Sequence, residues 1–449
     1  MNSVARNVPE TESHRGMGLT SDEIDSIFRP QFPLCRLVLG VSGGPDSLAL
    51  LYLFHEWTKR VGWTGDILVA TIDHGLRPES AAEAQQVGER ARAMGLRHVV
   101  RTWEGEKPSS NIQAQARAAR YRLFAQEMAS IGADALVLAH HLDDQAETFL
   151  DRLTRGSGVY GLGAMIGDDS GGPEGLRIMR PFLEVPKSAL MDALRARGIP
   201  WVCDPSNYDP AYKRARLRQI MGGLAEEGLT SQRLADTARR MRRAREGLDY
   251  CCRSILNAHL VCHPAGPVRL PWNSIGDPPE EIRLRLLAHL ILGVTGQQAP
   301  GRLAKLEGLL FTLEAHERVK QTLSGAVVQR QDDTLYLWKE VGRTPPAVCR
   351  VADLVAAAQA NGRPAIWDGR YHLGLEGAGF LNSDVVIGPL VRAPGPRDGL
   401  TLPSDFPVAA FACAPAFWDS EGLLYVPDLF QMRGSEAAYP LSLKRTGLF

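Results

Sequence analysis

The sequence predicts an α/β protein whose main domain is a doubly wound parallel sheet, followed by a helical second domain and a small C-terminal α+β or β module. Two observations lead to this class. From Leu34 onward, short apolar runs alternate with helical patterns, which is the rhythm of successive strand and helix units. At 449 residues the chain also exceeds what one hydrophobic core usually serves, so several domains are expected.

Four strand–helix units account for the first part of the main domain. Apolar runs bounded by turn residues predict the strands, while Gly95 and Asn111 mark a helix end and a helix start. The predicted strands are 37–41, 67–72, 98–103 and 135–139, and the predicted helices are 46–60, 80–94, 111–131, 143–155 and 187–197. Between the last two helices, residues 156–175 are rich in glycine and are expected to form a mobile loop.

Changes in composition give the expected domain boundaries. Residues 1–33 begin with a polar, aperiodic stretch and are predicted to be a disordered tail, and 34–224 form the α/β domain. Residues 225–345 are helical and rich in arginine, which suits contact with a polyanion or a solvated helix face. Residues 346–449 are rich in Gly and Pro with short apolar runs, and their function cannot be read from the sequence.

Charge and cysteine content limit the possible partners and cellular compartment of the protein. Lys plus Arg and Asp plus Glu are equal at 51 each, so global charge neither favours nor excludes a polyanionic partner. The seven cysteines form no C-x-x-C pair and read as reduced thiols. Without an apolar run long enough for a signal peptide or a membrane span, a cytoplasmic protein with no membrane partner is expected. The oligomeric state stays open, a homodimer included.

The strongest motif is Ser42-Gly43-Gly44-Pro45-Asp46-Ser47, which lies between a predicted strand and a predicted helix. This geometry aims backbone N–H groups and a helix N-terminus at an anion, although a plain glycine turn is the alternative. The motif lacks the Gly-Lys-Ser/Thr ending of a Walker A loop and the glycine spacing of a dinucleotide fingerprint. It resembles the PP-loop of ATP pyrophosphatases, Ser-Gly-Gly-x-Asp-Ser, at every fixed position. The resemblance implies that ATP is split into AMP and pyrophosphate, with the pyrophosphate held here.

Polar residues also follow two other predicted strands. One strand ends in Asp73-His74-Gly75-Leu76-Arg77, and another runs into the segment from His140 to Thr148. Each residue alone reads as a turn or cap, but ligands of such sheets bind at the carboxyl ends of the strands, where these residues converge. Asp144 and Glu147 share one helix face and can hold Mg²⁺ or a cationic amine, whereas Asp143 is expected to be a helix cap.

The same motifs, in the same order, make the chain resemble the bacterial tRNA(Ile)-lysidine synthetases. The resemblance covers roughly residues 34–220 and rests on the PP-loop and on 73–77, 111–121, 140–148, 155–158 and 204–218. Arg214-Ala215-Arg216 departs from the Arg-Asn-Arg that the family commonly has, which puts one polar contact in question. The resemblance implies a C–N ligase in which ATP, with Mg²⁺, adenylates C2 of the wobble cytidine in isoleucine tRNA with a CAU anticodon. The ε-amine of free L-lysine then displaces AMP and gives lysidine. The resemblance also implies that the helical, arginine-rich domain of residues 225–345 contacts the tRNA.

The resemblance and the residue chemistry together assign site roles. ATP binding is expected at Ser42, Gly43, Gly44, Pro45, Asp46, Ser47, Asp73 and His74. The catalytic residues are expected to be Asp46, Arg120, His140, Asp144 and Glu147, with Mg²⁺ on Asp46 and Asp144. Lysine or RNA is expected to bind at Asp144, Glu147 and Arg214. Which carboxylate acts as the base, and whether Arg214 contacts lysine or RNA, stays open.

Other functions compete with this interpretation. Another PP-loop modification of tRNA, such as thiolation, would activate a base in the same way, but it normally uses a paired cysteine motif that is absent. Synthetases that make GMP, asparagine or NAD share the loop and are expected to carry further blocks. A nonenzymatic RNA-binding protein on a decayed PP-loop is the alternative from another class, and the intact loop argues against it.

Overall fold

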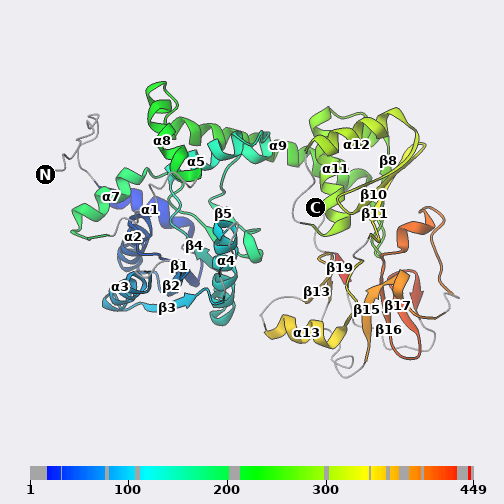
Figure 1. The fold of residues 1–449 in the computed structure, drawn as a ribbon, viewed down its shortest axis with the longest axis horizontal. Coiled ribbons are helices and arrows are strands. Elements are labelled where there is room, and N and C mark those ends of the chain that lie inside the picture. Colours follow the sequence, from blue (N-terminus) through cyan, green and yellow to red (C-terminus); the bar gives the residue numbers. More distant parts are fainter. Residues whose placement is uncertain are drawn as a thin grey trace. The chain divides into compact units, whose positions relative to one another are not determined.

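The chain folds into two compact units, Met1–Arg245 and Glu246–Phe449 (Figure 1). The structure is a computed structural model. It describes residues 18–31, 33–75, 80–105, 107, 112–201, 213–297, 303–342, 345–360, 365–373, 384–395, 399–431 and 443–445. The predicted start of the long helix at Asn111 lies outside the described residues. So do residues 204–212 of the family motif 204–218.

A six-stranded sheet in the order β3-β2-β1-β4-β6-β5 forms the centre of the first unit. Its strands are β1 Arg36–Gly40, β2 Asp66–Asp73, β3 Arg97–Thr102, β4 Ala135–Val137, β5 Asp168–Asp169 and β6 Ile178–Met179. Neighbouring strands run parallel except at β5, which pairs antiparallel with β6. The strand order reverses between β1 and β4, so a crevice for a ligand is expected at their carboxyl ends.

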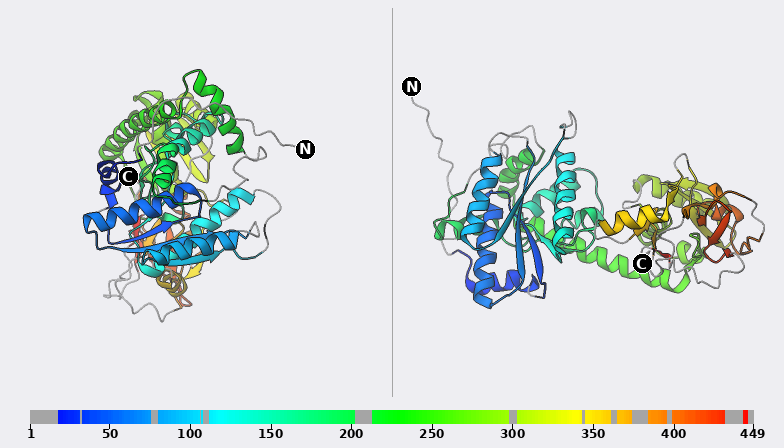
Figure 2. Two further views of the ribbon diagram at one scale, coloured as in Figure 1. Left: turned by 90° about the vertical axis from the view of Figure 1, so that its left-hand side faces the viewer. Right: turned by 90° about the horizontal axis from the view of Figure 1, so that it is seen from below.

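Helices cover both faces of this sheet, which confirms the doubly wound fold (Figure 2). Successive residues of a strand point to opposite faces, so Leu37 and Leu39 join one core while Val38 joins the other. The first core is closed by α1 Ser21–Phe28, α2 Pro45–Val61, α3 Ser80–Ala93 and α7 Lys187–Ala196. The second core is closed by α4 Ile112–Ile131.

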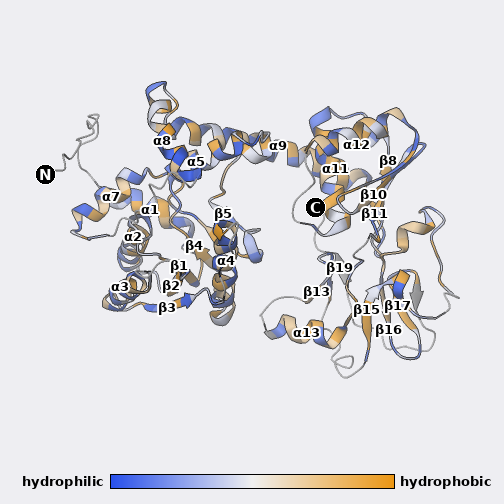
Figure 3. Cartoon of the chain, viewed as in Figure 1, coloured by the Kyte–Doolittle hydropathy of each residue, from blue (hydrophilic) through white to orange (hydrophobic). Residues whose placement is uncertain are grey.

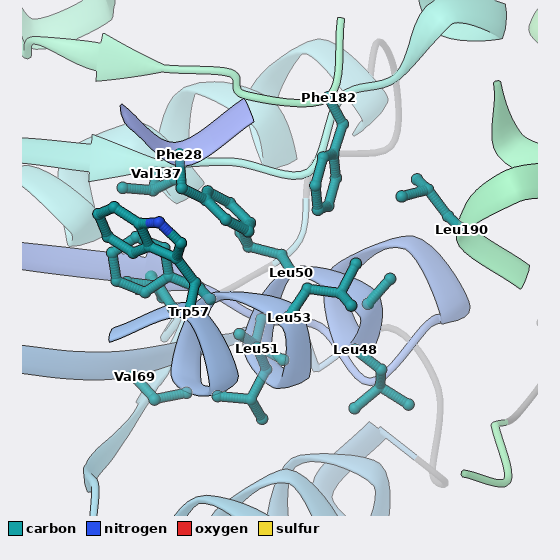
Figure 4. Close-up of a cluster of buried hydrophobic side chains, with 14 of the residues drawn as sticks. Phe28, Leu48, Leu50, Leu51, Leu53, Trp57, Val69, Val137, Phe182 and Leu190 are labelled. Carbon is teal, nitrogen blue, oxygen red and sulfur yellow. The ribbon is translucent and has the colours of Figure 1, made fainter. Parts of the chain in front are cut away.

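The helix α1 lies within residues 1–33, where the sequence predicted a disordered tail, so that prediction is wrong for this segment. A capping box between Thr20 and Glu23 begins the helix, and the 3₁₀ turn Arg29–Gln31 follows it. Phe28 is buried with its ring 5.1 Å from that of Phe54 and 5.7 Å from that of Trp57 (Figure 4). The apolar stripe of this short helix was too brief to stand out from its polar surroundings.

Residues 156–175, predicted to be a mobile loop, contain α6 Val159–Leu162, β5 and a 3₁₀ turn at Pro173–Gly175. Arginine side chains hold the carbonyl groups of this segment. Nη1 of Arg152 donates to Gly161 O at 2.6 Å and to Ala164 O at 3.0 Å, and Nη2 of Arg242 donates to Met165 O at 2.6 Å. The sequence did not reveal this order, because Arg242 is distant along the chain.

Three further helices complete the first unit, namely α5 Leu142–Leu153, α8 Lys213–Glu226 and the start of α9 Ser231–His259. Their shared core joins Phe149 of α5 with Leu217 of α8 and Leu234 of α9. Hydrophobic residues are spaced among hydrophilic ones along α9 (Figure 3), and they favour one side of the helix, as in an amphipathic helix. Because α5 starts directly after β4, this packing fixes the direction in which α5 leaves the sheet.

The second unit begins with helices and a five-stranded antiparallel sheet in the order β7-β8-β11-β10-β9. The strands are β7 Val261–Cys262, β8 Val268–Pro271, β9 Arg318–Leu323, β10 Ala326–Gln331 and β11 Thr334–Lys339. The helices α10 Asn273–Gly276, α11 Glu280–Thr295 and α12 Leu303–Ala315 accompany it. The region predicted as helical therefore also carries a sheet. The sequence analysis missed its hairpins, which turn at Ser324-Gly325 and at Asp332 with positive φ angles.

The last part of the chain is an α+β module, as predicted. One sheet has the order β12-β15-β16-β17-β18, and a smaller sheet has the order β13-β14-β19. Its elements are β12 Cys349–Arg350, α13 Val351–Ala360, β13 Ala365–Trp367, β14 Tyr371–Leu373, β15 Val386–Pro389, η5 Leu390–Arg392, η6 Val408–Phe411, β16 Pro415–Trp418, β17 Leu423–Val426, β18 Phe430–Gln431 and β19 Leu443–Arg445. Within the described parts of the chain, no helix combines the length and apolarity that crossing a membrane requires.

Candidate active site

The PP-loop motif connects β1 to α2 at the switch point of the sheet. Gly43 has a φ of +90°, which favours glycine, and Gly44 is the N-cap of α2 with Pro45 at its first position. Ser47 fixes the turn internally, because its Oγ accepts from Ser42 N at 3.1 Å and donates to Gly44 O at 3.0 Å. No described residue accepts from the N–H of Gly43 or Gly44. The loop therefore presents backbone donors and a helix N-terminus to an anion.

A second glycine lets the sheet approach its covering helix at this end. A Cβ at Gly40, the last residue of β1, would lie 2.7 Å from Leu138 Cδ2 and 3.0 Å from Phe124 Cζ. Only a residue without a side chain fits this gap without displacing Leu138. The absence of a side chain at Gly40 therefore lets the end of β1 lie close to Leu138, which follows β4, and to Phe124 of α4.

A buried histidine joins the PP-loop to the start of α5. His141 is the N-cap of α5 and is 2% exposed. Its Nε2 lies 3.6 Å from Asp46 Oδ2 and 3.5 Å from Asp144 Oδ2, and its backbone N–H donates to Asp144 Oδ2 at 3.0 Å. Burial lowers the pKa of His141, but the Asp46 hydrogen bond and the nearby carboxylates outweigh it, so the pKa is above its ordinary value.

Asp46 sits in the first turn of α2 with two cationic groups on one oxygen. Besides His141, Nζ of Lys187 lies 3.5 Å from Asp46 Oδ2. Burial raises the pKa of the Asp46 carboxyl, but hydrogen bonding and charge from His141 and Lys187 leave it below its ordinary value. The other oxygen, Oδ1, is buried and has no hydrogen-bond partner among the described residues. Asp46 is thus an ionised carboxylate with one coordination position to spare.

This donor set fits a divalent cation bound together with phosphate. The described residues contain no cluster of three His, Cys, Asp or Glu that would hold a metal without a substrate. Mg²⁺ commonly takes only one or two carboxylates and completes its shell with phosphate oxygens and water. The unpartnered Oδ1 of Asp46 is an oxygen ligand of the kind that Mg²⁺ prefers, and it lies at the start of the pyrophosphate cradle.

Glu147 lies one helical turn beyond Asp144 and is 2% exposed. Arg218 of α8 forms a two-point ion pair with it, through Nε to Oε1 and through Nη2 to Oε2 at 3.2 Å. Burial raises the pKa of Glu147 and Arg218 offsets part of this effect, so the pKa lies above its ordinary value. The two carboxylates that were expected to act together therefore have different partners, His141 for Asp144 and Arg218 for Glu147.

The prediction that Asp143 caps its own helix is wrong, because His141 takes that position. Oδ2 of Asp143 instead accepts from the backbone N–H of Lys187 at 3.0 Å, at the start of α7. Its Oδ1 accepts from Ser231 Oγ at 2.9 Å, at the start of α9. Asp143 therefore holds the first turns of three helices together beside the site.

At the end of β2, His74 and Asp73 have different roles. Nε2 of His74 lies 3.4 Å from Nη2 of Arg120 on α4. Burial, and then the charge of Arg120, lower the pKa of His74 to about 4, so the ring is neutral. Its Nδ1 is buried without a hydrogen-bond partner in the described chain. The Asp73 carboxylate closes the turn by accepting from Gly75 N at 2.8 Å and Ser80 Oγ at 2.7 Å.

His140 lies among positive charges. Burial lowers its pKa to about 3, Asp144 opposes this shift, and Arg180, Arg117 and Arg214 add to it. Its Nδ1 also lacks a partner among the described residues, as does Nε of the buried Arg180. The structure thus brings Arg120, His140 and Arg214 into one electrostatic neighbourhood. Neutral imidazole and guanidinium groups in this arrangement can bind phosphate, carboxylate or a base edge.

Comparison with known proteins decides the family. Residues 19–224 match a family model described as a PP-loop domain. The tRNA(Ile)-lysidine synthase of Methylobacterium nodulans is 43% identical over 68% of this chain and 91% of that protein. The synthase of Bradyrhizobium sp. is 40% identical over 73% and 95%, and that of Ruegeria pomeroyi is 37% identical over 89% and 90%.

This chain belongs to the tRNA(Ile)-lysidine synthase family. The sequence resemblance is thereby confirmed, and it extends beyond residue 220, because the Ruegeria pomeroyi synthase aligns over most of the chain. The PP-loop match starts at residue 19, so α1 belongs to the catalytic domain of this synthase family member rather than to a tail.

Four residues near the site were missed as candidates, namely His141, Arg180, Lys187 and Arg218. His141 and His140 are neighbours in the motif, and the sequence analysis chose His140 for catalysis. The structure shows that His141 is the one between the two carboxylates. Arg218 stands four residues after Arg214, so a helical face through Arg214 was the available signal. Lys187 and Arg180 gave no signal in the sequence.

The arginine cluster from Arg239 to Arg245 divides between structure and solvent. Arg239 pairs with Asp236 at 2.7 Å, Arg242 binds the carbonyls of the α6 segment, and Arg245 lies over the ring of Tyr160 at 5.0 Å. Arg240 and Arg243 are exposed. Arg239 is exposed as well, but its guanidinium is paired with Asp236.

Proposed function

We propose that the protein ligates free L-lysine to C2 of the wobble cytidine in isoleucine tRNA with a CAU anticodon, consuming ATP and releasing AMP and pyrophosphate. One observation carries the proposal. The PP-loop, the Asp46–His141–Asp144 cluster and the arginines around His140 meet at the carboxyl ends of the strands. They do so in a chain of the tRNA(Ile)-lysidine synthase family.

The first step is adenylation of cytidine. The C2 carbonyl oxygen of the base attacks the α-phosphorus of ATP, and the bond from that phosphorus to the pyrophosphate oxygen breaks. Backbone N–H groups of the loop from Ser42 to Ser47 hold the pyrophosphate, which leaves with the electron pair of the broken bond. Asp46 and Asp144 would hold Mg²⁺, which would supply positive charge to the phosphates. Arg120, whose Nη2 lies 3.4 Å from His74 Nε2 at the end of β2, offsets charge that develops on the α-phosphate.

The second step is attack by lysine. A lysine amine has a pKa of about 10.4 in water, so it must lose a proton before its nitrogen can attack C2. Glu147 is the stronger candidate for the base, because burial raises the pKa of its carboxyl and favours its taking a proton. Asp144 holds the ammonium before transfer. When the C–N bond forms, the C2–O bond breaks, and AMP carries away the oxygen that it received in the first step.

Four further residues complete the proposed site. His140 has a neutral ring with an unpartnered Nδ1, which suits a hydrogen bond to the base or the ribose. Arg214 is exposed on α8 and offers its guanidinium to the carboxylate of lysine or to an RNA phosphate. The exposed Arg240 and Arg243 suit the tRNA backbone. We place the reaction in the cytoplasm, where tRNA, ATP and free lysine meet.

A reconstituted reaction tests the proposal. Purified protein is incubated with ATP, Mg²⁺, labelled lysine and an isoleucine tRNA transcript with a CAU anticodon, and the nucleosides are then separated. The expected result is label in one modified cytidine, dependent on ATP. A matched transcript with uridine at the wobble position should take up no lysine.

The negative outcomes separate the alternatives. If ATP yields AMP and pyrophosphate with RNA present but lysine never enters the RNA, the PP-loop chemistry holds and the acceptor or nucleophile is wrong. Sulfur incorporation from a thiol donor would identify thiolation. No consumption of ATP under any of these conditions would favour a nonenzymatic RNA-binding protein.

A further inference from the structure

Lys187 is the one lysine of the described residues whose ammonium contacts the Asp46–His141–Asp144 cluster. It is the first residue of α7, and its Nζ lies 3.5 Å from Asp46 Oδ2. Its backbone is anchored, because its N–H donates to Asp143 Oδ2 at 3.0 Å. Its side chain is 38% exposed. The backbone of Lys187 is therefore anchored, while its side chain is accessible to solvent.

The contact with Asp46 satisfies only part of the hydrogen-bonding capacity of this ammonium. A lysine ammonium has three N–H donors, and Asp46 is the only acceptor it has among the described residues. The same Asp46 oxygen is also approached by His141 at 3.6 Å, so Asp46 keeps a cationic partner when Lys187 moves away. A half-exposed pair of this kind contributes little stability. Fold stability therefore gives no strong reason for a lysine at this position.

We propose that Lys187 binds the pyrophosphate half of ATP and neutralises the charge of the leaving group during adenylation. This inference rests on the proposed function and adds a residue that the motifs did not assign. In the nucleotide-free protein Asp46 holds the ammonium. When ATP enters, phosphate oxygens at the start of α2 take the place of Asp46 as its acceptor.

The chemistry of the step explains the need for such a group. As the bond from the α-phosphorus to the bridging oxygen breaks, the electron pair stays with the pyrophosphate. Negative charge therefore grows on the oxygens that the PP-loop holds. Backbone N–H groups supply dipoles there, but a full positive charge at hydrogen-bond distance stabilises such an anion more strongly. Lys187 reacts covalently with nothing and loses no proton.

Binding of inorganic pyrophosphate and of AMP measures this directly. Calorimetric titrations compare the full-length wild type with Lys187→Met, Lys187→Arg and the control Lys59→Met, an exposed lysine at the far end of α2. Lys187→Met should weaken pyrophosphate binding about tenfold to a hundredfold, as expected for one lost charge-assisted contact. Lys187→Arg should restore most of the affinity. AMP binding, and both titrations of Lys59→Met, should match the wild type.

A second measurement tests the exchange of partners. In buffer free of divalent cations, Asp46→Asn removes the competitor for Lys187 and a charge that repels the ligand. It should strengthen pyrophosphate binding more in the wild-type background than in Lys187→Met. Equal strengthening in both backgrounds would overturn the exchange. Unchanged pyrophosphate affinity in Lys187→Met, or equal loss of pyrophosphate and AMP affinity, would overturn the assignment of Lys187.

These titrations need neither tRNA nor lysine, so they fail or succeed independently of the modification reaction. If lysine transfer to tRNA is absent in the wild type while pyrophosphate binding depends on Lys187, only the proposed substrate is wrong. If the reverse holds, the proposed function stands and Lys187 has no part in it. The melting temperature of each variant shows whether it is folded.

Discussion

Each unit of the molecule buries a cluster of charged residues, and the two clusters differ in how completely they are paired. In the first unit Asp46, His74, His140 and Arg180 each retain a buried polar atom that has no partner among the described residues. In the second unit Arg370 is 2% exposed, yet it donates to Asp368 Oδ2 at 2.6 Å and to Cys413 O at 2.9 Å. Lys339 binds the other oxygen of Asp368 and also donates to Thr295 O at 3.3 Å.

This difference in pairing distinguishes a ligand-binding site from a cluster that stabilises the fold. A buried polar atom without a partner costs free energy, so a cluster that keeps several of them is built for atoms supplied by a ligand. In the Asp368 cluster, by contrast, the charged groups of the described residues satisfy one another. The Asp368 cluster joins the hairpin of β13 and β14 to β11 and α11, so its role is to hold the second unit together.

The largest effect on stability is expected when the fully paired Asp368 cluster of the second unit loses its carboxylate. Asp368→Asn leaves Arg370 and Lys339 buried without a counter-charge, and it should cost about 3 to 5 kcal/mol of stability. Asn is chosen because it tolerates the φ of +55° at this position. Denaturant unfolding measures the loss. The exposed pair of Asp405 with Arg269 is the control, since Asp405→Asn should cost at most about 1 kcal/mol.

In the Asp46 cluster of the first unit, loss of the carboxylate should lower the reaction rate rather than the stability. Asp46→Ala should reduce the rate of cytidine adenylation by about 10²- to 10³-fold, because it removes a carboxylate aimed at the phosphates. Its side chain is 28% exposed, so the melting temperature should change little. Filter binding should show tRNA affinity close to that of the wild type. Loss of tRNA binding with adenylation unaffected would contradict the assignment of this cluster.

Gln145 sharpens the comparison, because it is a fully paired residue within the catalytic unit. Its Nε2 donates to Met165 O at 2.9 Å and its Oε1 accepts from Met165 N at 2.8 Å. By the same criterion it is a scaffold residue. Gln145→Leu should speed hydrogen exchange at the Met165 amide by about tenfold or more. The exposed Gln85, whose Nε2 donates to Glu89, provides Gln85→Leu as a control that should leave this amide unchanged.

The smallest effect concerns Asp134, a paired carboxylate outside both clusters. The backbone N–H groups of Arg36 and Cys35 donate to it at 2.8 and 2.7 Å and hold its pKa below the ordinary value. A depressed folded pKa means that this stability is present above an unfolded pKa of about 3.9 and is lost as the pH falls through the folded pKa. Asp134→Asn should cost about 1 kcal/mol at pH 7, as judged from thermal melts.

Thermal melts at low pH test whether this loss comes from the charge of Asp134. The difference between Asp134→Asn and the wild type should shrink as the pH falls below about 4 and the carboxyl is protonated in both states. A difference that is constant from pH 7 to pH 3 would show that the loss comes from packing rather than from the charged hydrogen bonds.

Local chemistry was predictable from the sequence, whereas contacts between distant segments were not. The PP-loop could be identified because its glycines, Asp46 and Ser47 lie in one continuous stretch whose conformation they determine themselves. The partners of its carboxylate could not, because Lys187 comes from 141 positions further along the chain. Likewise Arg218 reaches Glu147 across 71 positions, and only the packing of α8 on α5 brings the two together.

Two misplaced features have equally physical causes. His140 and His141 carry the same chemistry, and the residue at which α5 begins decides which of them faces Asp46. That starting point depends on the competition between two acceptable caps, His141 and Asp143, and Asp143 is taken by α7. The sheet of the second unit was missed because tight turns with positive φ at Ser324 and Asp332 carry weaker sequence signals than Asn-Gly pairs.

Trapping the first intermediate tests the central claim most directly. The protein is incubated with Mg²⁺, ATP labelled at the α-phosphate and the CAU-anticodon transcript, with lysine left out. Our account predicts label on the RNA at the wobble cytidine, released as AMP when lysine is added. Label that never joins the RNA, or AMP formed at the same rate without RNA, would contradict activation of the base by these strand-end residues.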